Sequence, residues 1–176
     1  MQLTLSKSVI RGFRPEDAPS IVRHIGAYSV ARNLSVVPHP YVMQDAEEWI
    51  AGATARQPET QFAITIDDAV VGGIGVGLLD PQRKAATRCT AELGYWLGES
   101  FWGRGIMTEA VTAFTGWAFR NLDLVRIQAG VFARNLASAR VLTKTGFDLE
   151  GRLSAYYCKE GEFIDGLLFA KVRLPA

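Results

Sequence analysis

The pattern of apolar and polar positions predicts a chain in which strands and helices alternate. Short runs rich in β-branched and aromatic residues are typical of strands, and longer stretches repeat apolar residues at helical spacing. The expected strands cover residues 3–13, 62–66, 70–79, 88–97, 124–132, 147–156 and 163–172. The expected helices cover residues 18–28, a segment that starts at 45, residues 106–119 and a segment that ends near 145. This order of elements indicates a mixed α/β sandwich.

Capping and turn residues place several boundaries of these elements. Asp17 is expected to cap the first helix, and Asp45 to start the second. Asn135 is expected to cap the last helix, with Gly146 as its C-terminal stop. Asp67-Asp68 is expected to close a hairpin between the strands at 62–66 and 70–79.

Composition narrows the class of protein. At 176 residues and 48% hydrophobic content, we expect a single domain over residues 1–176, and no linker or repeat divides the chain. The net charge of +1 argues against direct nucleic-acid binding, and the short apolar runs argue against a membrane partner. Residues 1–7 show no signal-peptide core, and Cys89 and Cys158 form no disulfide framework or metal cluster. A cytoplasmic protein with reduced thiols is therefore expected.

A glycine-bearing loop before the helix at 106–119 carries the clearest chemical signal. Gly103 and Gly105 lack side chains, so the backbone can approach a ligand closely and can adopt positive φ. The amides of residues 104–108 would then lie at a helix N-terminus, where unpaired N–H groups and the helix dipole attract anions. The loop predicts a phosphate or pyrophosphate site, although two glycines before a helix also fit an ordinary tight turn.

Three motifs in fixed order and spacing make the chain resemble a GNAT-superfamily N-acetyltransferase. They are Ala91-Glu92-Leu93-Gly94-Tyr95-Trp96-Leu97, residues 102–110 around Gly103-Arg104-Gly105, and residues 135–147 from Asn135 to Gly146-Phe147. Phe13-Arg14-Pro15 extends the resemblance toward the N-terminus, and it is strongest to the branch that acetylates the N-terminal serine or alanine of ribosomal proteins. It implies a GNAT-like acyl-CoA N-acyltransferase fold, with a mixed, mostly antiparallel central sheet and helices on both faces.

The resemblance also implies acetyl-CoA as the donor, coenzyme A as the product and no metal. In the family, the cofactor enters between the fourth and fifth strands, where the fourth-strand backbone pairs with the pantetheine arm. Bulky Met107 must point away from the phosphates, while Arg140 and Lys144 either reach a phosphate or lie on a solvated helix face. The implied cofactor-binding residues are Tyr95, Trp96, Leu97, Trp102, Gly103, Arg104, Gly105, Ile106, Met107, Thr108, Asn135, Ser138, Arg140 and Lys144.

Two residues are the catalytic candidates. The branch uses the position of Ser138 to protonate the coenzyme A thiolate, whereas the usual superfamily tyrosine is replaced by Leu142. Glu92 is the leading candidate for the base, because a carboxylate in an apolar strand must be solvated, paired or functional. Alternation places it on the face shared with Gly94 and Trp96. The alternatives are a helix-capping role for Ser138 and a structural hydrogen bond for Glu92.

The acceptor side is expected near Arg32 and Asn33 and near Tyr156 and Tyr157. Tyr157 stands roughly where relatives in the branch carry a glutamate, so one of the two tyrosines could shape the acceptor slot or hold a water. An α-amine with a pKa near ~8 is roughly a tenth neutral at pH 7, whereas lysine is neutral at well below one part in a thousand, a gap on the order of 3 kcal/mol. A weak base therefore favours an α-amine, on a protein N-terminus or a small amine, acetylated by direct transfer in a ternary complex.

Two other classes stay open at this point. Loss of the usual tyrosine and of the hairpin glutamate also fits a catalytically weak acetyl-CoA sensor or interaction module, and a homodimer is compatible with either. A different nucleotide binder is disfavoured, because the chain lacks a βαβ unit with a downstream ribose-binding acid and lacks a Walker lysine.

Overall fold

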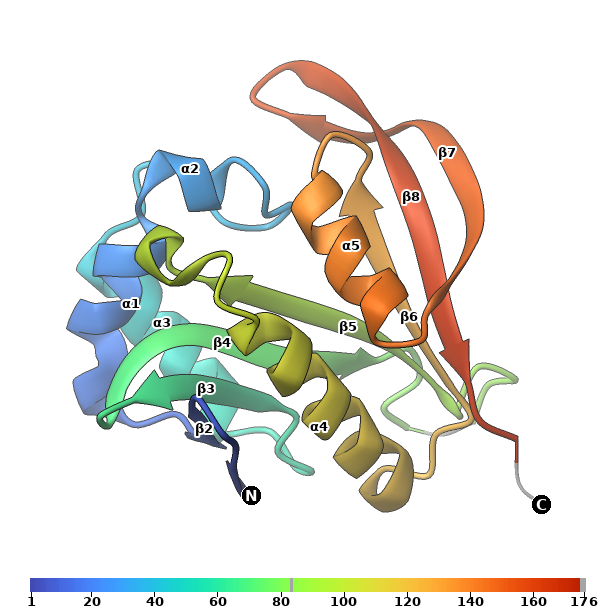
Figure 1. The fold of residues 1–176 in the computed structure, drawn as a ribbon, viewed down its shortest axis with the longest axis horizontal. Helices are drawn as coiled ribbons and strands as arrows, with labels where there is room; N and C mark the ends of the chain where they lie inside the picture. Colours follow the sequence, from blue (N-terminus) through green and yellow to red (C-terminus); the bar gives the residue numbers. More distant parts are fainter. Residues whose placement is uncertain (83, 175–176) are drawn as a thin grey trace. The chain divides into compact units, whose positions relative to one another are not determined.

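The structure, a computed structural model that describes residues 1–82 and 84–174, combines a mixed sheet with helices (Figure 1). The strands are β1 (Gln2–Thr4), β2 (Val9–Gly12), β3 (Gln61–Ile66), β4 (Ala69–Leu78), β5 (Thr90–Leu97), β6 (Arg126–Phe132), β7 (Asp148–Lys159) and β8 (Glu162–Val172). The helices are α1 (Ala18–Ile25), α2 (Tyr28–Ala31), α3 (Met43–Thr54), α4 (Ile106–Asn121) and α5 (Leu136–Lys144), with 3-10 turns η1 (Pro15–Asp17) and η2 (Glu99–Phe101).

The strands follow the order β1-β2-β3-β4-β5-β6-β8-β7. β5 and β6 run parallel, whereas β1–β2, β2–β3, β3–β4, β6–β8 and β7–β8 run antiparallel. The predicted mixed, mostly antiparallel sheet is thereby confirmed. The chain divides into two compact units, which we describe separately: unit 1 comprises residues 1–75 and 95–110, and unit 2 comprises residues 76–94 and 111–176.

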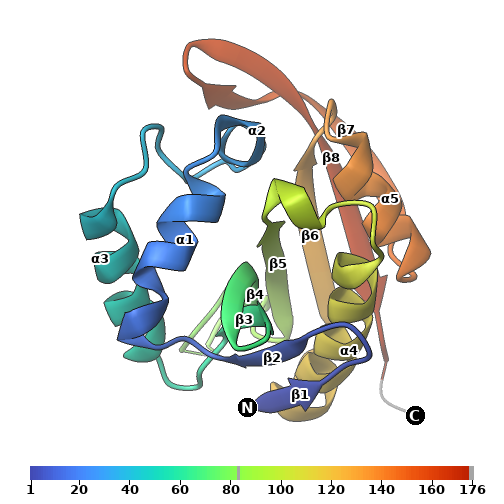
Figure 2. The ribbon, with the colours of Figure 1, turned by 60° about the vertical axis from the view of Figure 1, so that its left-hand side comes forward.

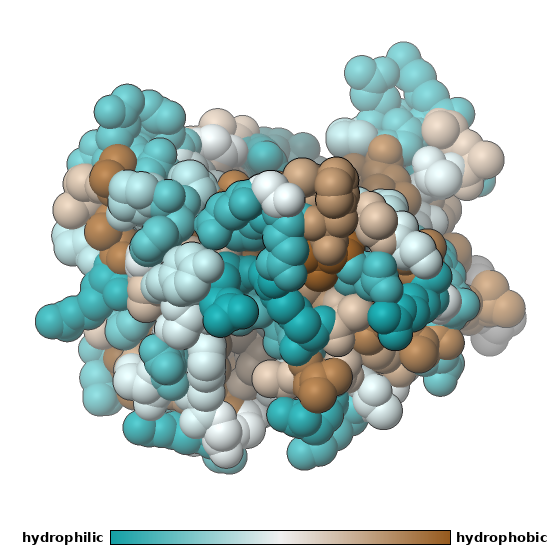
Figure 3. Space-filling model, turned by 90° about the horizontal axis from the view of Figure 1, so that it is seen from above, coloured by the Kyte–Doolittle hydropathy of each residue, from teal (hydrophilic) through white to brown (hydrophobic). Residues whose placement is uncertain are grey.

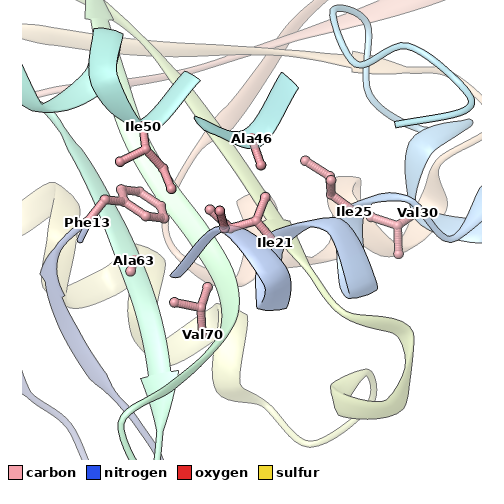
Figure 4. Packing of buried hydrophobic residues seen from close by; sticks show 9 residues of the cluster. Phe13, Ile21, Ile25, Val30, Ala46, Ile50, Ala63 and Val70 are labelled. Atoms are coloured by element: carbon pink, nitrogen blue, oxygen red, sulfur yellow. The ribbon is translucent and has the colours of Figure 1, made fainter. Parts of the chain in front are cut away.

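Unit 1 has an apolar core in which α1 and α3 pack against strands of the sheet. Ile21 and Ile25 project from α1, and Ala46 and Ile50 project from α3, each pair four residues apart and therefore on one helix face (Figure 4). Ala63 of β3 and Val70 of β4, together with Phe13, complete the cluster, as Figure 4 shows.

A buried ion pair joins β2 to the turn η1 in unit 1. Arg11 donates two hydrogen bonds of 2.8 Å to the Asp17 carboxylate, and both side chains are less than a tenth exposed. Asp17 also accepts from the Arg14 amide at 2.8 Å, while Arg11 Nε donates to Asp68 at 3.1 Å. The prediction that Asp17 caps α1 is wrong in this respect: its oxygens bind Arg11 and the amide before η1, and α1 has no side-chain cap.

The N-terminal segment departs from the single predicted strand at 3–13. It forms a hairpin of β1 and β2, closed by a 2.9 Å hydrogen bond from the Leu5 amide to the Ser8 carbonyl (Figure 2). The polar tip of this turn, Ser6-Lys7, interrupts an otherwise strand-like pattern. The first helix also ends earlier than predicted, at Ile25, and the short α2 follows it.

Unit 2 contains the pairing of β5 with β6 and the long β7–β8 hairpin. The parallel ladder pairs Thr90 with Arg126, Ala91 with Ile127 and Glu92 with Gln128. Asn135 caps α5 as predicted, because its side chain accepts from the Ser138 amide at 3.1 Å. Gly146 follows α5 with φ of +80°, which confirms the predicted stop. Likewise, in unit 1, Asp67-Asp68 closes the predicted β3–β4 hairpin with positive φ at both residues.

The surface mixes polar and apolar residues. The face seen in Figure 3 carries apolar side chains interspersed with hydrophilic ones. Among the described residues, no helix has both the length and the hydrophobicity that a bilayer crossing requires.

The ion pair between Arg11 and Asp17 generates a stability prediction. Replacing Arg11 with Met leaves the Asp17 carboxylate buried without its partner, so we expect the free energy of unfolding to fall by about 3–5 kcal/mol. Arg14→Met is the matched control, because Arg14 and its partner Asp68 are both more than half exposed and their ion pair is weak in water. Urea denaturation of both variants measures the difference, and equal losses would contradict a dominant role for the buried pair.

Candidate functional site

The glycine loop of unit 1 presents a run of unpaired main-chain amides. Gly103 and Gly105 adopt φ of +74° and +76°, a conformation that side chains disfavour. Within the described part of the chain, the N–H groups of residues 103–107 donate to no protein acceptor. A Cβ built on Gly103 would meet no atom within 4 Å, so the space beside this residue is open. These donors at the start of α4 suit an anionic group with several oxygens.

The side chains around the loop are either buried or in contact with neighbouring groups. Ile106 and Met107 are buried, and Met107 is only 7% exposed, so its side chain lies within the protein. The Arg104 guanidinium lies over the Phe101 ring at 5.5 Å, and Trp102 Nε1 donates to the Leu97 carbonyl at 2.7 Å. Thr108 is half-buried in the first turn of α4.

The end of β5 in unit 1 has a defined orientation. The Gly98 amide donates to the Val71 carbonyl at 2.8 Å, and the Trp96 carbonyl also faces β4, because it would lie 2.6 Å from a Cβ on Gly72. Main-chain groups alternate along a strand, so those of Tyr95 and Leu97 are directed to the opposite edge of β5. The Leu97 carbonyl there is already engaged by Trp102.

Unit 2 brings Glu92 and Tyr157 together over a glycine of β6. A Cβ on Gly130 would lie less than 3.0 Å from Tyr157 Oη and 3.6 Å from Glu92 Oε1. Glu92 is exposed between buried Ala91 and Leu93, as the strand alternation predicts. Burial, and secondarily the Glu92 charge, raise the pKa of Tyr157 to about 12, so this hydroxyl stays protonated at neutral pH.

A bulge in β7 sets the direction of Tyr157. The β7–β8 register shifts between Leu153 and Tyr157, and Ala155 adopts φ of +49°. Asp165 stabilises this bulge: it accepts from the Ala155 amide at 2.8 Å and from Arg152 at 2.7 and 2.9 Å. The hydrogen bond from Ala155, followed by those from Arg152, lowers the pKa of Asp165.

The Tyr157 ring is held by its packing in unit 2. It contacts Phe132 at a centroid distance of 4.7 Å and Tyr156 at 4.8 Å. Its edge also lies against Gly166 of β8, where a Cβ would be 3.1 Å from Cε2. Sequence reasoning missed Gly130, Gly166 and Asp165, although a glycine inside a strand signals a close approach of another group.

The other expected residues have varied surroundings. Ser138 is half-buried in the first turn of α5, whereas Arg140 and Lys144 lie exposed on that helix and Leu142 is fully buried. In unit 1, the Asn33 side chain donates to the Ser29 carbonyl at 2.9 Å.

Arg32 and Tyr156 are exposed. The Arg32 guanidinium lies over the Tyr28 ring at 5.7 Å in unit 1. Apart from its ring contact with Tyr157, Tyr156 projects from the bulged part of β7 with 61% of its surface exposed.

Comparison with known proteins gives relatives of several kinds. The chain is 28% identical over 175 residues to the N-acetyltransferase p20 of Bacillus licheniformis, covering 97% of this chain and 96% of p20. It is 27% identical over 173 residues to the L-amino acid N-acetyltransferase AaaT of Escherichia coli, covering 96% and 100%. It is 34% identical over 104 residues to the ribosomal-protein-serine acetyltransferase of Escherichia coli, covering 59% of this chain and 52% of that protein.

A solved structure and a family model agree with these relatives. The structure of RimL, a ribosomal alpha-N-protein acetyltransferase in complex with coenzyme A, matches with a TM-score of 0.83 at 21% identity and covers 98% of both chains. The family model for the acetyltransferase (GNAT) domain matches residues 8–148. The chain belongs to the GNAT family and is an acetyl-CoA-dependent N-acetyltransferase.

Proposed function

We propose that this enzyme transfers an acetyl group directly from acetyl-CoA to an α-amine, on a free amino acid or at a protein N-terminus. The observation that carries the donor side of the proposal is the run of unpaired amides at residues 103–107. The acceptor side is supported by Glu92 and Tyr157, which converge on Gly130, and by the chemistry shared by the named relatives.

The glycine loop is the proposed site for the diphosphate of coenzyme A. Its N–H groups can donate to the phosphate oxygens, and the α4 dipole adds favourable potential. The open side of Gly103, where a Cβ would meet no protein atom, is space that a phosphate could use. When bound, acetyl-CoA supplies the activated acetyl thioester.

The α-amine proposal draws on two of the relatives. AaaT is named for L-amino acids, whose shared amine is the α-amine, and RimL is named as an alpha-N-protein acetyltransferase. The protonation argument points the same way, since deprotonating a lysine at pH 7 costs on the order of 3 kcal/mol more than deprotonating an α-amine.

Three side chains of unit 2 have proposed roles in moving protons. Glu92 accepts the proton that the amine loses as its nitrogen bonds to the acetyl carbon, directly or through one water. Tyr157 stays protonated and donates a hydrogen bond to Glu92 or to that water. Ser138 passes a proton to the sulfur as the carbon–sulfur bond breaks and regains one from water, while Glu92 releases the amine proton to water. Both side chains thereby return to their starting states, and coenzyme A leaves with its thiol restored.

The diphosphate role of the loop predicts a specific effect of Gly103→Ala. The added methyl would occupy space assigned to a phosphate, so we expect the thermal stabilisation by acetyl-CoA to be largely lost. Gly161→Ala is the matched control, because Gly161 also has positive φ, +80°, and open space around its Cβ. Both variants should lose similar stability without ligand, and only Gly161→Ala should keep the full shift with acetyl-CoA.

Retention of the shift in Gly103→Ala would contradict the diphosphate role of the loop. For the unaltered protein, stabilisation by NAD or ATP in place of acetyl-CoA would contradict it as well.

The α-amine proposal predicts a ranking of acceptors. Amino acids and peptides with a free N-terminus should release free thiol from acetyl-CoA, whereas N-terminally blocked peptides that carry lysine should react at least about 100-fold more slowly, following the difference in neutral amine. Mass spectrometry of the products locates the acetyl group. Preferred acetylation of the lysine side chain would refute the proposal, and cofactor binding without any turnover would favour the sensor alternative.

The proposed roles of Glu92 and Tyr157 predict energetic coupling. Glu92→Gln and Tyr157→Phe should each lower kcat by about 10- to 100-fold, and the double variant should lose little more, because both act on one proton. Ser138 acts on a different proton, the one that the sulfur takes up. The loss of kcat in Ser138→Ala should therefore add to the loss in Glu92→Gln or in Tyr157→Phe. Because the pKa of Tyr157 is about 12, its hydroxyl keeps its proton up to about pH 10, and Tyr157→Phe should not change the shape of the pH profile below that value.

Steady-state kinetics of the single and double variants measure this coupling. A further variant, Gly130→Ala, places a methyl group where the Tyr157 hydroxyl lies, so it should mimic Tyr157→Phe. Gly77→Ala is its control, because a Cβ on Gly77 would meet no atom within 4 Å. Fully additive losses of kcat from Glu92→Gln and Tyr157→Phe would contradict the proposal that the two residues act on one proton.

A further inference from the structure

The tip of the β1–β2 hairpin is attached to the glycine loop at two points in unit 1. Lys7 Nζ donates to the Arg104 carbonyl at 2.7 Å, and the Ser6 amide donates to Glu109 Oε1 in the first turn of α4 at 2.7 Å. Figure 2 shows the hairpin turn beside the start of α4. These contacts join segments about a hundred residues apart in the sequence.

The bond from Lys7 fixes the peptide between Arg104 and Gly105. In a trans peptide the C=O and N–H point in opposite directions, so a carbonyl held by Lys7 directs the Gly105 N–H away from the hairpin. The ammonium also lies 3.2 Å from the position that a Gly105 Cβ would take. Both glycines of the loop are intrinsically flexible, and the loop therefore gains order from a bond that selects one orientation.

Glu109 accepts the second hydrogen bond from the hairpin, and it also places a negative charge near the glycine loop. The Ser6 amide hydrogen bond, together with the Lys7 charge, lowers the pKa of Glu109, so this carboxylate is ionised at neutral pH. An anion in the first turn of α4 stabilises the helix, yet it would repel a diphosphate bound at the same end. The Lys7 ammonium, which contacts the Arg104 carbonyl and whose charge acts on Glu109, offsets this repulsion.

We propose that Lys7 is a positioning residue for coenzyme A: its ammonium holds the Arg104 carbonyl and thereby presents the Gly105 N–H to the diphosphate. This inference rests on the proposed diphosphate role of the loop. It gives the β1–β2 hairpin a function in cofactor binding that the motifs of the loop itself do not contain.

Calorimetry with two ligands tests the role of Lys7. Coenzyme A contains the diphosphate and pantetheine lacks it, so Lys7→Met should weaken binding of coenzyme A about tenfold, the worth of one charge-assisted hydrogen bond. Turnover of S-acetylpantetheine at high concentration should be unchanged. Lys84→Met is the matched control, because Lys84 is an exposed lysine of unit 2, and it should affect neither ligand.

Amide NMR without ligand separates positioning from a simple attraction of charge. If Lys7 orders the loop, Lys7→Met should shift and broaden the Gly105 resonance in the ligand-free protein and raise its exchange with solvent, while Lys84→Met should not. An unchanged Gly105 signal in Lys7→Met would overturn the positioning role.

The outcomes distinguish this inference from the proposed function. If the unaltered protein binds coenzyme A no more tightly than pantetheine, the loop is not a diphosphate site and the role of Lys7 falls with it. If the unaltered protein prefers coenzyme A and Lys7→Met binds it equally well, only the role of Lys7 is refuted. Loss of S-acetylpantetheine turnover in Lys7→Met would assign the residue to folding and would also overturn the inference.

Discussion

A main-chain N–H group needs a hydrogen-bond acceptor, and the glycine loop before α4 departs from this constraint. Strand ladders, helices and capping side chains such as Asn135 provide acceptors for most of the backbone. At residues 103–107, five consecutive amides are left without a protein acceptor in the described structure. Water can serve exposed groups there, but so can an anion, and Gly103 and Gly105, which adopt positive φ, add no side chains of their own beside these amides.

Such a loop must be held in place by residues outside it, and in unit 1 this support comes from the N-terminal hairpin. Lys7 and Ser6 attach the hairpin tip to the loop and to α4. A few residues further along the same hairpin, Arg11 ties β2 to Asp17 through a buried ion pair. The ion pair stabilises the position of β2, and β2 in turn carries the turn that contacts Arg104. The stability of unit 1 and the geometry of the proposed cofactor loop therefore depend on one short strand.

The sequence could predict those features that depend on neighbouring residues. The cap at Asn135, the stop at Gly146 and the turn at Asp67-Asp68 follow from backbone preferences within a few residues, and the structure confirms all three. The turn at Ser6-Lys7 was missed, because polar residues in an alternating stretch also fit the exposed face of a strand. The local preference of Asp17 for a helix cap was overridden by Arg11, a partner that only the folded chain brings close.

The meeting of Glu92 and Tyr157 lay beyond sequence reasoning for the same reason. It depends on the absence of a side chain at Gly130, on the bulge that Asp165 stabilises and on the register of the four strands β5, β6, β8 and β7. Each of these is unremarkable in the sequence, and only their combination directs the Tyr157 hydroxyl toward the Glu92 side of β6.

The chemistry of this pair limits what the enzyme can acetylate under the proposed mechanism. A tyrosine with a pKa of about 12 keeps its proton near neutral pH, so in the proposed mechanism it donates a hydrogen bond and does not act as the base. The acceptance of the amine proton then depends on Glu92, which is exposed, and a carboxylate is in general a much weaker base than an amine. A weak base can serve an amine that is already partly neutral, but it cannot supply the additional ~3 kcal/mol that a lysine side chain requires at pH 7. Under the proposed mechanism, a preference for an α-amine therefore follows from the protonation of the amines themselves, whether the α-amine belongs to a free amino acid or to a protein N-terminus.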